Sequence, residues 1–233
     1  RNSGSPLLER LLRLLVAGSE LRRRRALYAI SSATRGNLDV QAALCELQVA
    51  EPALSISSIL LKQKGGPELQ RKILAFAADM LEEYTFIQQA LASPSDLADP
   101  QLSGEEAMMH LADTIPQLKA LQPIGAHVCS ADWARAGFDV LAATTRQLQA
   151  AQGSAVSLDG TFTEAAHHGS PLLRAVVENA VIMLHKLLAC PQLPLQATAE
   201  ERLALQGAAE WARRAGDSAG DVLANALSLL ESL

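Results

Sequence analysis

Aromatic residues are scarce in this chain of 233 residues. They make up 3% of the sequence, although hydrophobic residues together make up 49%. Aromatic and β-branched side chains are the usual occupants of strands, whereas alanine and leucine, which dominate here, are good helix formers. The composition therefore argues against a β fold, and its hydrophobic fraction is too high for a disordered chain. An all-α protein is predicted.

Cysteine is also rare, and no two cysteines have the spacing of a zinc or redox site. Cys45, Cys129 and Cys190 lie far apart, without a CxxC motif, so that neither a disulfide framework nor a zinc site is indicated. No N-x-[ST] glycosylation motif is present. Charged residues interrupt every leucine-rich run well before the roughly 20 apolar residues that a membrane span requires. We expect no membrane insertion.

Clustered positive charge is missing over most of the chain, whose formal net charge is −5. A protein that binds nucleic acid needs basic residues gathered on its surface to neutralise phosphates, so nucleic acid is not an expected partner. Arginines at positions 22–25 form the one basic run. Consecutive residues of a helix point in different directions, and a solvated helix face explains this run; contact with an acidic partner surface is the alternative.

The motifs of catalysis, metal binding and nucleotide binding are absent as well. The sequence has neither a GxxxxGK[ST] loop nor a GxGxxG motif, and Cys45 has no basic neighbour that would lower its pKa. None of the five histidines is followed four residues later by another His, Cys or carboxylate, the spacing of a zinc-binding helix. Those histidines are His110, His127, His167, His168 and His185. We therefore expect no enzyme activity, no metal and no cofactor.

An internal repeat is the strongest positive signal. The segment RRALYAI at residues 24–30 returns as RKILAFA at residues 71–77, an offset of 47 residues, and each copy follows another apolar segment, at residues 7–15 and 54–62. A period of about 40 to 47 residues with two or three helices is typical of armadillo and HEAT repeats. The sequence thus predicts an armadillo-like helical solenoid, a right-handed superhelix.

Later segments continue the helical pattern less regularly. Helices are predicted at residues 131–149, 171–189, 198–214 and 217–233, the third beginning at a capping Thr198. Residues 93–104 and 153–169 are rich in Gly, Pro, Ser and Thr and are predicted as loop insertions between repeats. Neither is typical of a linker, so one domain over residues 1–233 is expected. Because it begins at Arg1 without methionine, we interpret the chain as the C-terminal part of a longer protein.

In an armadillo stack, the third helix of each repeat lines a concave groove. This row of helices is the surface that remains for a function. These helices are expected at residues 6–17, 51–64 and 131–149. Polar residues three or four positions apart, opposite the leucine stripes, mark their exposed faces. The predicted contact residues are Glu9, Arg10, Arg13, Ser55, Ser58, Lys62, Arg135, Asp139 and Arg146. Ordinary solvated helix faces are the alternative interpretation.

Four segments give the chain a family resemblance. Residues 7–16, RRRALYAISS at 23–32, LSISSILLKQKG at 54–65 and LQRKILAFAADML at 69–81 together resemble the armadillo-type nucleotide exchange factors of the seventy-kilodalton heat-shock chaperones. The order is similar too: a leucine-rich helix, a basic-led helix, a short helix ending in Lys-Gly, and a helix ending at Leu81. The resemblance is strong over residues 7–81, and the insertion at 153–169 departs from it.

The acidic insertion after Leu81, the helix with Trp133 and the final SLLESL resemble the endoplasmic-reticulum branch, which serves the chaperone BiP. The resemblance implies a monomeric co-chaperone of the endoplasmic-reticulum lumen, with the cytoplasm as the alternative. It would bind the nucleotide-binding domain of a BiP-like chaperone, favour its open form and release ADP. A generic armadillo or HEAT adaptor without exchange activity is the second hypothesis, although Trp133 and Trp211 are the only tryptophans for a peptide groove.

Overall fold

All regular elements that the structure describes are helices. The computed structural model describes residues 6–62, 65–93, 130–153, 171–188, 190 and 197–233, and five isolated residues between 109 and 119. No strand occurs within these ranges, so the all-α prediction is confirmed. Apart from Ser93 and Gly153, the predicted insertions at 93–104 and 153–169 lie outside the described residues.

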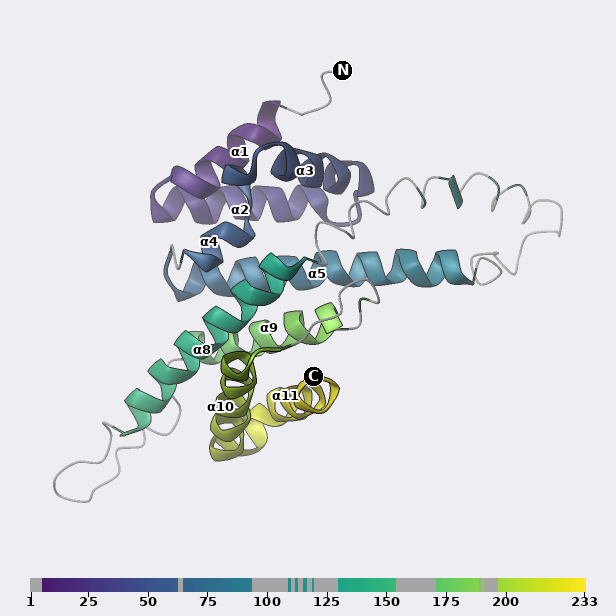
Figure 1. Ribbon diagram of the computed structural model, residues 1–233. Helices are drawn as coiled ribbons and strands as arrows, with labels where there is room; N and C mark the ends of the chain where they lie inside the picture. The colour runs from purple at the N-terminus through teal and green to yellow at the C-terminus, as the bar shows by residue number, and fades with distance from the viewer. Residues whose placement is uncertain are drawn as a thin grey trace.

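The elements follow one another along the chain as α1 (Pro6–Ala17), α2 (Glu20–Thr34), α3 (Leu38–Ala50), the 3-10 turn η1 (Pro52–Leu54), α4 (Ser57–Leu61), α5 (Pro67–Ala92), α8 (Ala131–Gly153), α9 (Pro171–Leu188), α10 (Ala199–Ala215), the 3-10 turn η4 (Gly216–Ala219) and α11 (Gly220–Ser232). Figure 1 shows the early helices on one side of α5 and helices α9 to α11 on the other.

The helices contact one another in two rows. In the first row, α1 packs on η1, α4 packs on α8, and α8 packs on α10. In the second row, α2 packs on α5, α5 on α9, and α9 on α11. Contacts of α1 with α2, of α8 with α9, and of α10 with α11 join the rows, while α3 lies against α2 and η1 (Figure 1). The two copies of the sequence repeat therefore occupy corresponding rows, because residues 7–15 and 54–62 lie in the first row and residues 24–30 and 71–77 in the second.

Local sequence explains where several helices begin. Thr198 forms a capping box: its hydroxyl accepts a hydrogen bond from the Glu201 N–H at 3.2 Å, and its own N–H donates to the Glu201 carboxylate at 2.7 Å. Pro67 occupies the first turn of α5, where its missing N–H is not needed. The predicted start of α10 is thus confirmed.

The helix expected at residues 51–64 is wrong as one continuous element. Within residues 51–62, which the structure describes, only η1 and the five-residue α4 form, because the Ile56 N–H donates at 2.8 Å to the buried amide oxygen of Gln48 instead of to its own segment. The Ser58 hydroxyl also donates to the Ser55 carbonyl at 2.7 Å. Such side-chain bonds to the backbone compete with helix formation, so the segment turns.

Two further helices differ from the sequence-based expectation. The helix that was expected to end at Leu81 continues as α5 to Ala92, since nothing after Leu81 stops it: Tyr84 and Ile87 continue the buried stripe. Helix α3 was not predicted at all. It begins where Gly36 adopts a positive φ of 62° and where the Asn37 side chain accepts a hydrogen bond from the Val40 N–H at 3.2 Å.

A single hydrophobic core runs between the rows, built mainly of leucine, isoleucine, valine and alanine. Helices α8 and α9 cross closely at Gly137, where an added Cβ atom would lie 2.5 Å from Met183 Cε and 3.1 Å from Leu184 Cδ2. Polar contacts tie α5 to α9 as well. The Asn179 amide donates to the Arg71 carbonyl at 3.2 Å, and Lys186 Nζ donates to the Ala78 carbonyl at 3.4 Å.

Candidate functional site

All nine predicted contact residues lie on the first row or directly beside its helices. On α1, Arg13 forms an ion pair with Glu9 at 2.8 Å and another with Glu51 at 3.0 Å. The hydrogen bond that Arg13 donates to Glu9 and the negative charge of Glu51 raise the pKa of the Arg13 guanidinium. Glu9 and Arg13 therefore connect α1 to the end of α3, whereas Arg10 is exposed to solvent.

The serines next to α4 are engaged within their own turn. Ser58 is half-buried and bonds the Ser55 carbonyl, and the Ser55 hydroxyl lies 2.8 Å from that of Ser57. The expectation that Ser58 is exposed is wrong, because the short α4 turns this side chain back toward the chain. Lys62 is exposed as expected.

The three predicted residues of α8 come together in a groove between α8 and α10. Arg135, Asp139 and Arg146 are all exposed and line it. Two adjoining cavities of about 450 Å³ and about 480 Å³ make up this groove. Besides these three residues, the lining consists of Phe138, Ala142, Thr145, Gln149, Thr198, Glu200, Glu201, Leu203, Ala204 and Gly207. We call it the α8–α10 groove.

The α8–α10 groove offers both charge and apolar surface. Arg135 and Arg146 form no ion pair with a carboxylate of the described residues, although Arg146 Nε donates to the Ala142 carbonyl at 3.1 Å. Leu203 is 64% exposed at the rim. Gly207 lets α10 lie close to α8 on one side of the groove, because an added Cβ would lie only 3.3 Å from Thr145 Cγ2. Two unpaired guanidinium groups beside an exposed leucine suit recognition of a protein surface.

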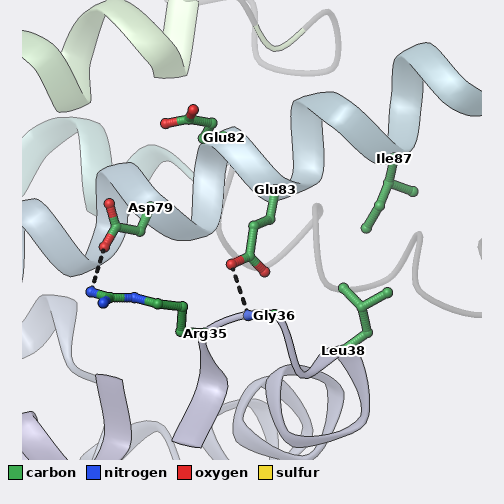
Figure 2. A pocket seen from close by; sticks show the side chains of 7 residues that line it. All are labelled: Arg35, Gly36, Leu38, Asp79, Glu82, Glu83 and Ile87. Atoms are coloured by element: carbon green, nitrogen blue, oxygen red, sulfur yellow. Dashed lines mark hydrogen bonds and ion pairs between the residues drawn. The ribbon is translucent and has the colours of Figure 1, made fainter. Parts of the chain in front are cut away.

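A second cleft, which the sequence analysis missed, lies between the turn from α2 to α3 and helix α5. Its volume is about 630 Å³, and its lining is Arg35, Gly36, Leu38, Asp79, Glu82, Glu83 and Ile87. Figure 2 shows Arg35 reaching toward Asp79 at one end and Leu38 facing Ile87 at the other. The Arg-Gly-Asn sequence could have indicated the turn itself. Nothing in it indicates which part of α5 the turn contacts.

The carboxylates of this cleft hold the turn in place. Glu83 accepts a hydrogen bond from the Gly36 N–H at 3.2 Å (Figure 2) and another from the buried Gln41 amide. Arg35 lies 3.8 Å from Asp79, a long distance for an ion pair, and burial raises the pKa of Asp79 although Arg35 opposes the shift. Because these carboxylates already bind groups of the chain itself, we interpret them as a structural connection.

Glu82 belongs to another connection, since it points away from Arg35 in Figure 2 and forms an ion pair with Lys186 of α9. The hydrogen bond from Lys186 lowers the pKa of Glu82. Its side chain is 72% exposed, so solvent screens this pair strongly. The pair therefore adds little to the packing of α9 on α5, but it directs Glu82 toward α9.

No arrangement of groups for metal chemistry is found in the described part of the chain. No cluster of three or more His, Cys, Asp or Glu side chains that could hold a metal ion occurs among the residues described. Among those same residues, no helix is both long enough and apolar enough to cross a bilayer.

Cys45 of α3 is expected to resist thiol reagents at pH 8 as long as the protein is folded. The side chain is buried, and burial, assisted by the charge of Glu46, raises the pKa of its thiol to about 12. The reactive thiolate is then rare at that pH. Iodoacetamide labelling followed by mass spectrometry checks this: Cys45 should be alkylated rapidly in urea and much more slowly in buffer. Labelling at equal rates in both solvents would contradict it.

No protein-family model, no curated protein and no solved structure matches this chain.

Proposed function

We propose that this chain is an armadillo-like nucleotide exchange factor for a seventy-kilodalton heat-shock chaperone. The observation that carries the proposal is the placement of Arg135, Asp139 and Arg146 together in the α8–α10 groove, on the row of helices that also bears α1 and α4. Protein recognition is the chemistry that this groove favours, since it combines unpaired charges with exposed apolar surface. The resemblance over residues 7–81 supplies the identity of the proposed partner.

An armadillo-like solenoid is the architecture that we propose for the two rows. In such a stack each repeat contacts its neighbours. Here the helices of the second row pack on one another in the order α2, α5, α9 and α11, and in the first row α4, α8 and α10 do the same, while α1 contacts η1. The repeat at residues 24–30 and 71–77 supports this interpretation, because α2 and α5, which contain the two copies, pack together. From the resemblance, we propose that the chaperone is BiP and that the compartment is the lumen of the endoplasmic reticulum.

Exchange on this scheme needs no catalytic group. The factor binds the open form of the nucleotide-binding domain more tightly than the closed form and so shifts the population toward the state that releases ADP. If binding weakens the affinity for ADP a hundredfold, the coupling free energy is about 2.7 kcal/mol. Linkage is reciprocal, so nucleotide weakens the affinity for the factor by the same ratio.

The release of fluorescently labelled ADP from a purified BiP nucleotide-binding domain tests the proposal. The rate of ADP release should rise severalfold or more when the purified chain is added at micromolar concentration, in excess over the nucleotide-binding domain. An unchanged rate, together with no binding in a pull-down, would overturn the proposed partner. Binding without acceleration would instead assign the chain to the class of helical-repeat adaptors.

A further inference from the structure

The outer face of α2 is an exposed stripe of apolar and basic side chains. Leu21 is 54% exposed and Tyr28 is 72% exposed. Arg25 and Ser32, both exposed, continue the same three- and four-residue spacing, which places all four side chains on one side of the helix. We call these four residues, with the adjacent Arg22, the outer face of α2.

No helix of the described residues packs on this face. Helix α2 packs on α1, α3 and α5, and its buried residues are Ala26, Leu27, Ile30 and Thr34, on the opposite side of the helix. An exposed leucine alone needs no explanation, but a tyrosine and a leucine aligned with arginines form a contiguous surface of mixed character. Such a surface is typical of a contact site, where tyrosine and arginine are enriched.

The charges of this face are unpaired. Arg24 forms an ion pair with Glu20 at 3.5 Å, but exposed Arg22 and Arg25 form none with a carboxylate of the described residues. Four consecutive arginines also stand in the N-terminal half of α2, near the positive end of the helix dipole, where positive charge is unfavourable. Repulsion among them adds to that cost. Residues that break a local rule without a gain for the fold are often retained for function.

We propose that the outer face of α2 docks an acidic amphipathic helix of a partner protein. Glutamate or aspartate side chains of that helix pair with Arg22 and Arg25, and its apolar stripe covers Leu21 and Tyr28. Exposed Arg22 and Arg25 complement carboxylates, and the exposed Leu21 and Tyr28 beside them offer apolar surface. A helix that carries both acidic and apolar side chains matches this mixed face, so it is the occupant that we propose. The site is independent of the proposed exchange function, because it lies on the second row.

Fluorescence anisotropy with a labelled designed peptide tests this docking site. The probe is a short amphipathic helix with glutamates three and four residues apart beside a leucine stripe, and its matched control carries glutamine in place of each glutamate. The intact chain should bind the glutamate peptide in the micromolar range at low salt and the glutamine peptide at least about tenfold more weakly. Equal affinities, or no binding of the glutamate peptide, would overturn the proposal.

Charge reversal identifies the surface. The double variant Arg22→Glu/Arg25→Glu should weaken binding of the glutamate peptide at least about tenfold, since it sets like charges against each other. The variant Arg213→Glu/Arg214→Glu, which changes the net charge equally at exposed positions of α10, should bind as the unmodified chain does. Equal losses in the two variants would refute a site on α2. Tighter binding to phosphatidylserine vesicles or to a DNA oligonucleotide than to the peptide would also refute an acidic protein as the occupant.

Tyr28 supplies a readout that does not depend on charge. Tyr28→Ala should weaken binding of the glutamate peptide severalfold with the melting temperature unchanged, because the side chain is exposed in the free chain and becomes covered in the complex. Unaltered binding would remove the apolar half of the proposed site. Circular dichroism of each variant confirms that the chain remains folded.

Discussion

The variant Arg135→Glu/Arg146→Glu is expected to lose most of the proposed acceleration of ADP release from a BiP nucleotide-binding domain. At equal subsaturating concentrations, its acceleration should be at least about tenfold smaller than that of the unmodified chain. Both arginines line the α8–α10 groove, and neither is neutralised by a carboxylate of the described residues. Reversing their charge replaces attraction to a partner carboxylate by repulsion. Because both side chains are exposed, the melting temperature should change little.

The matched control for this result is again Arg213→Glu/Arg214→Glu, which alters the same number of charges on α10 outside both cavities of the groove. It should retain full acceleration. If the two double variants lose activity equally, net charge rather than the groove governs binding, and the placement of the contact surface is wrong. Raising the salt concentration should weaken partner binding by the unmodified chain more than binding by the groove variant, because only the unmodified chain retains the arginine contacts.

Leu184→Ala is expected to lower the free energy of unfolding by about 2 to 5 kcal/mol. Leu184 of α9 is fully buried and lies against α8 at Gly137, where the two helices cross closely. Removing its branched end leaves a cavity that α8 cannot fill, since a helix backbone moves only as a unit. Chemical denaturation followed by circular dichroism measures the change.

Leu203→Ala is the matched control, the same substitution at a side chain that is 64% exposed. Its effect on stability should stay within about 0.5 kcal/mol. A comparable loss for both leucines would mean that the packing of α8 on α9 does not hold the two rows together. The control also has a use of its own, because Leu203 lies at the rim of the α8–α10 groove and its removal should weaken partner binding.

The sequence predicted the helices that carry a clear periodic stripe or a clear start signal. Thr198 and Pro67 mark helix starts through local chemistry, which depends only on neighbouring residues. The interruption after Pro52 was missed because its cause is the hydrogen bond that the Ile56 N–H donates to the Gln48 side-chain oxygen. A glutamine in a helical pattern gives no sign that its side chain will bind another segment.

The candidate site was also predictable only where it depends on residues close in sequence. Spacing alone placed Arg135, Asp139 and Arg146 on one face of α8, and the structure adds the opposite wall, which α10 supplies. Spacing could not reveal that Arg13 is held by Glu51, because that ion pair joins residues 38 positions apart. It also could not reveal the cleft of Figure 2, whose walls come from a turn and a distant helix.

The contacts between α5 and α9 have a consequence for the rate of folding. Asn179 and Arg71, like Lys186 and Ala78, are 108 positions apart in the sequence. Closing a flexible loop of that length costs about 4 kcal/mol of chain entropy, before any constant term. The chain loses this entropy before the contacts that compensate for it have formed. Most helical proteins fold through contacts between near neighbours, but here the second row is completed only when two remote stretches meet. We therefore expect α5 and α9 to acquire hydrogen-exchange protection together, in a slow final phase of refolding, after α1 and α2 have paired.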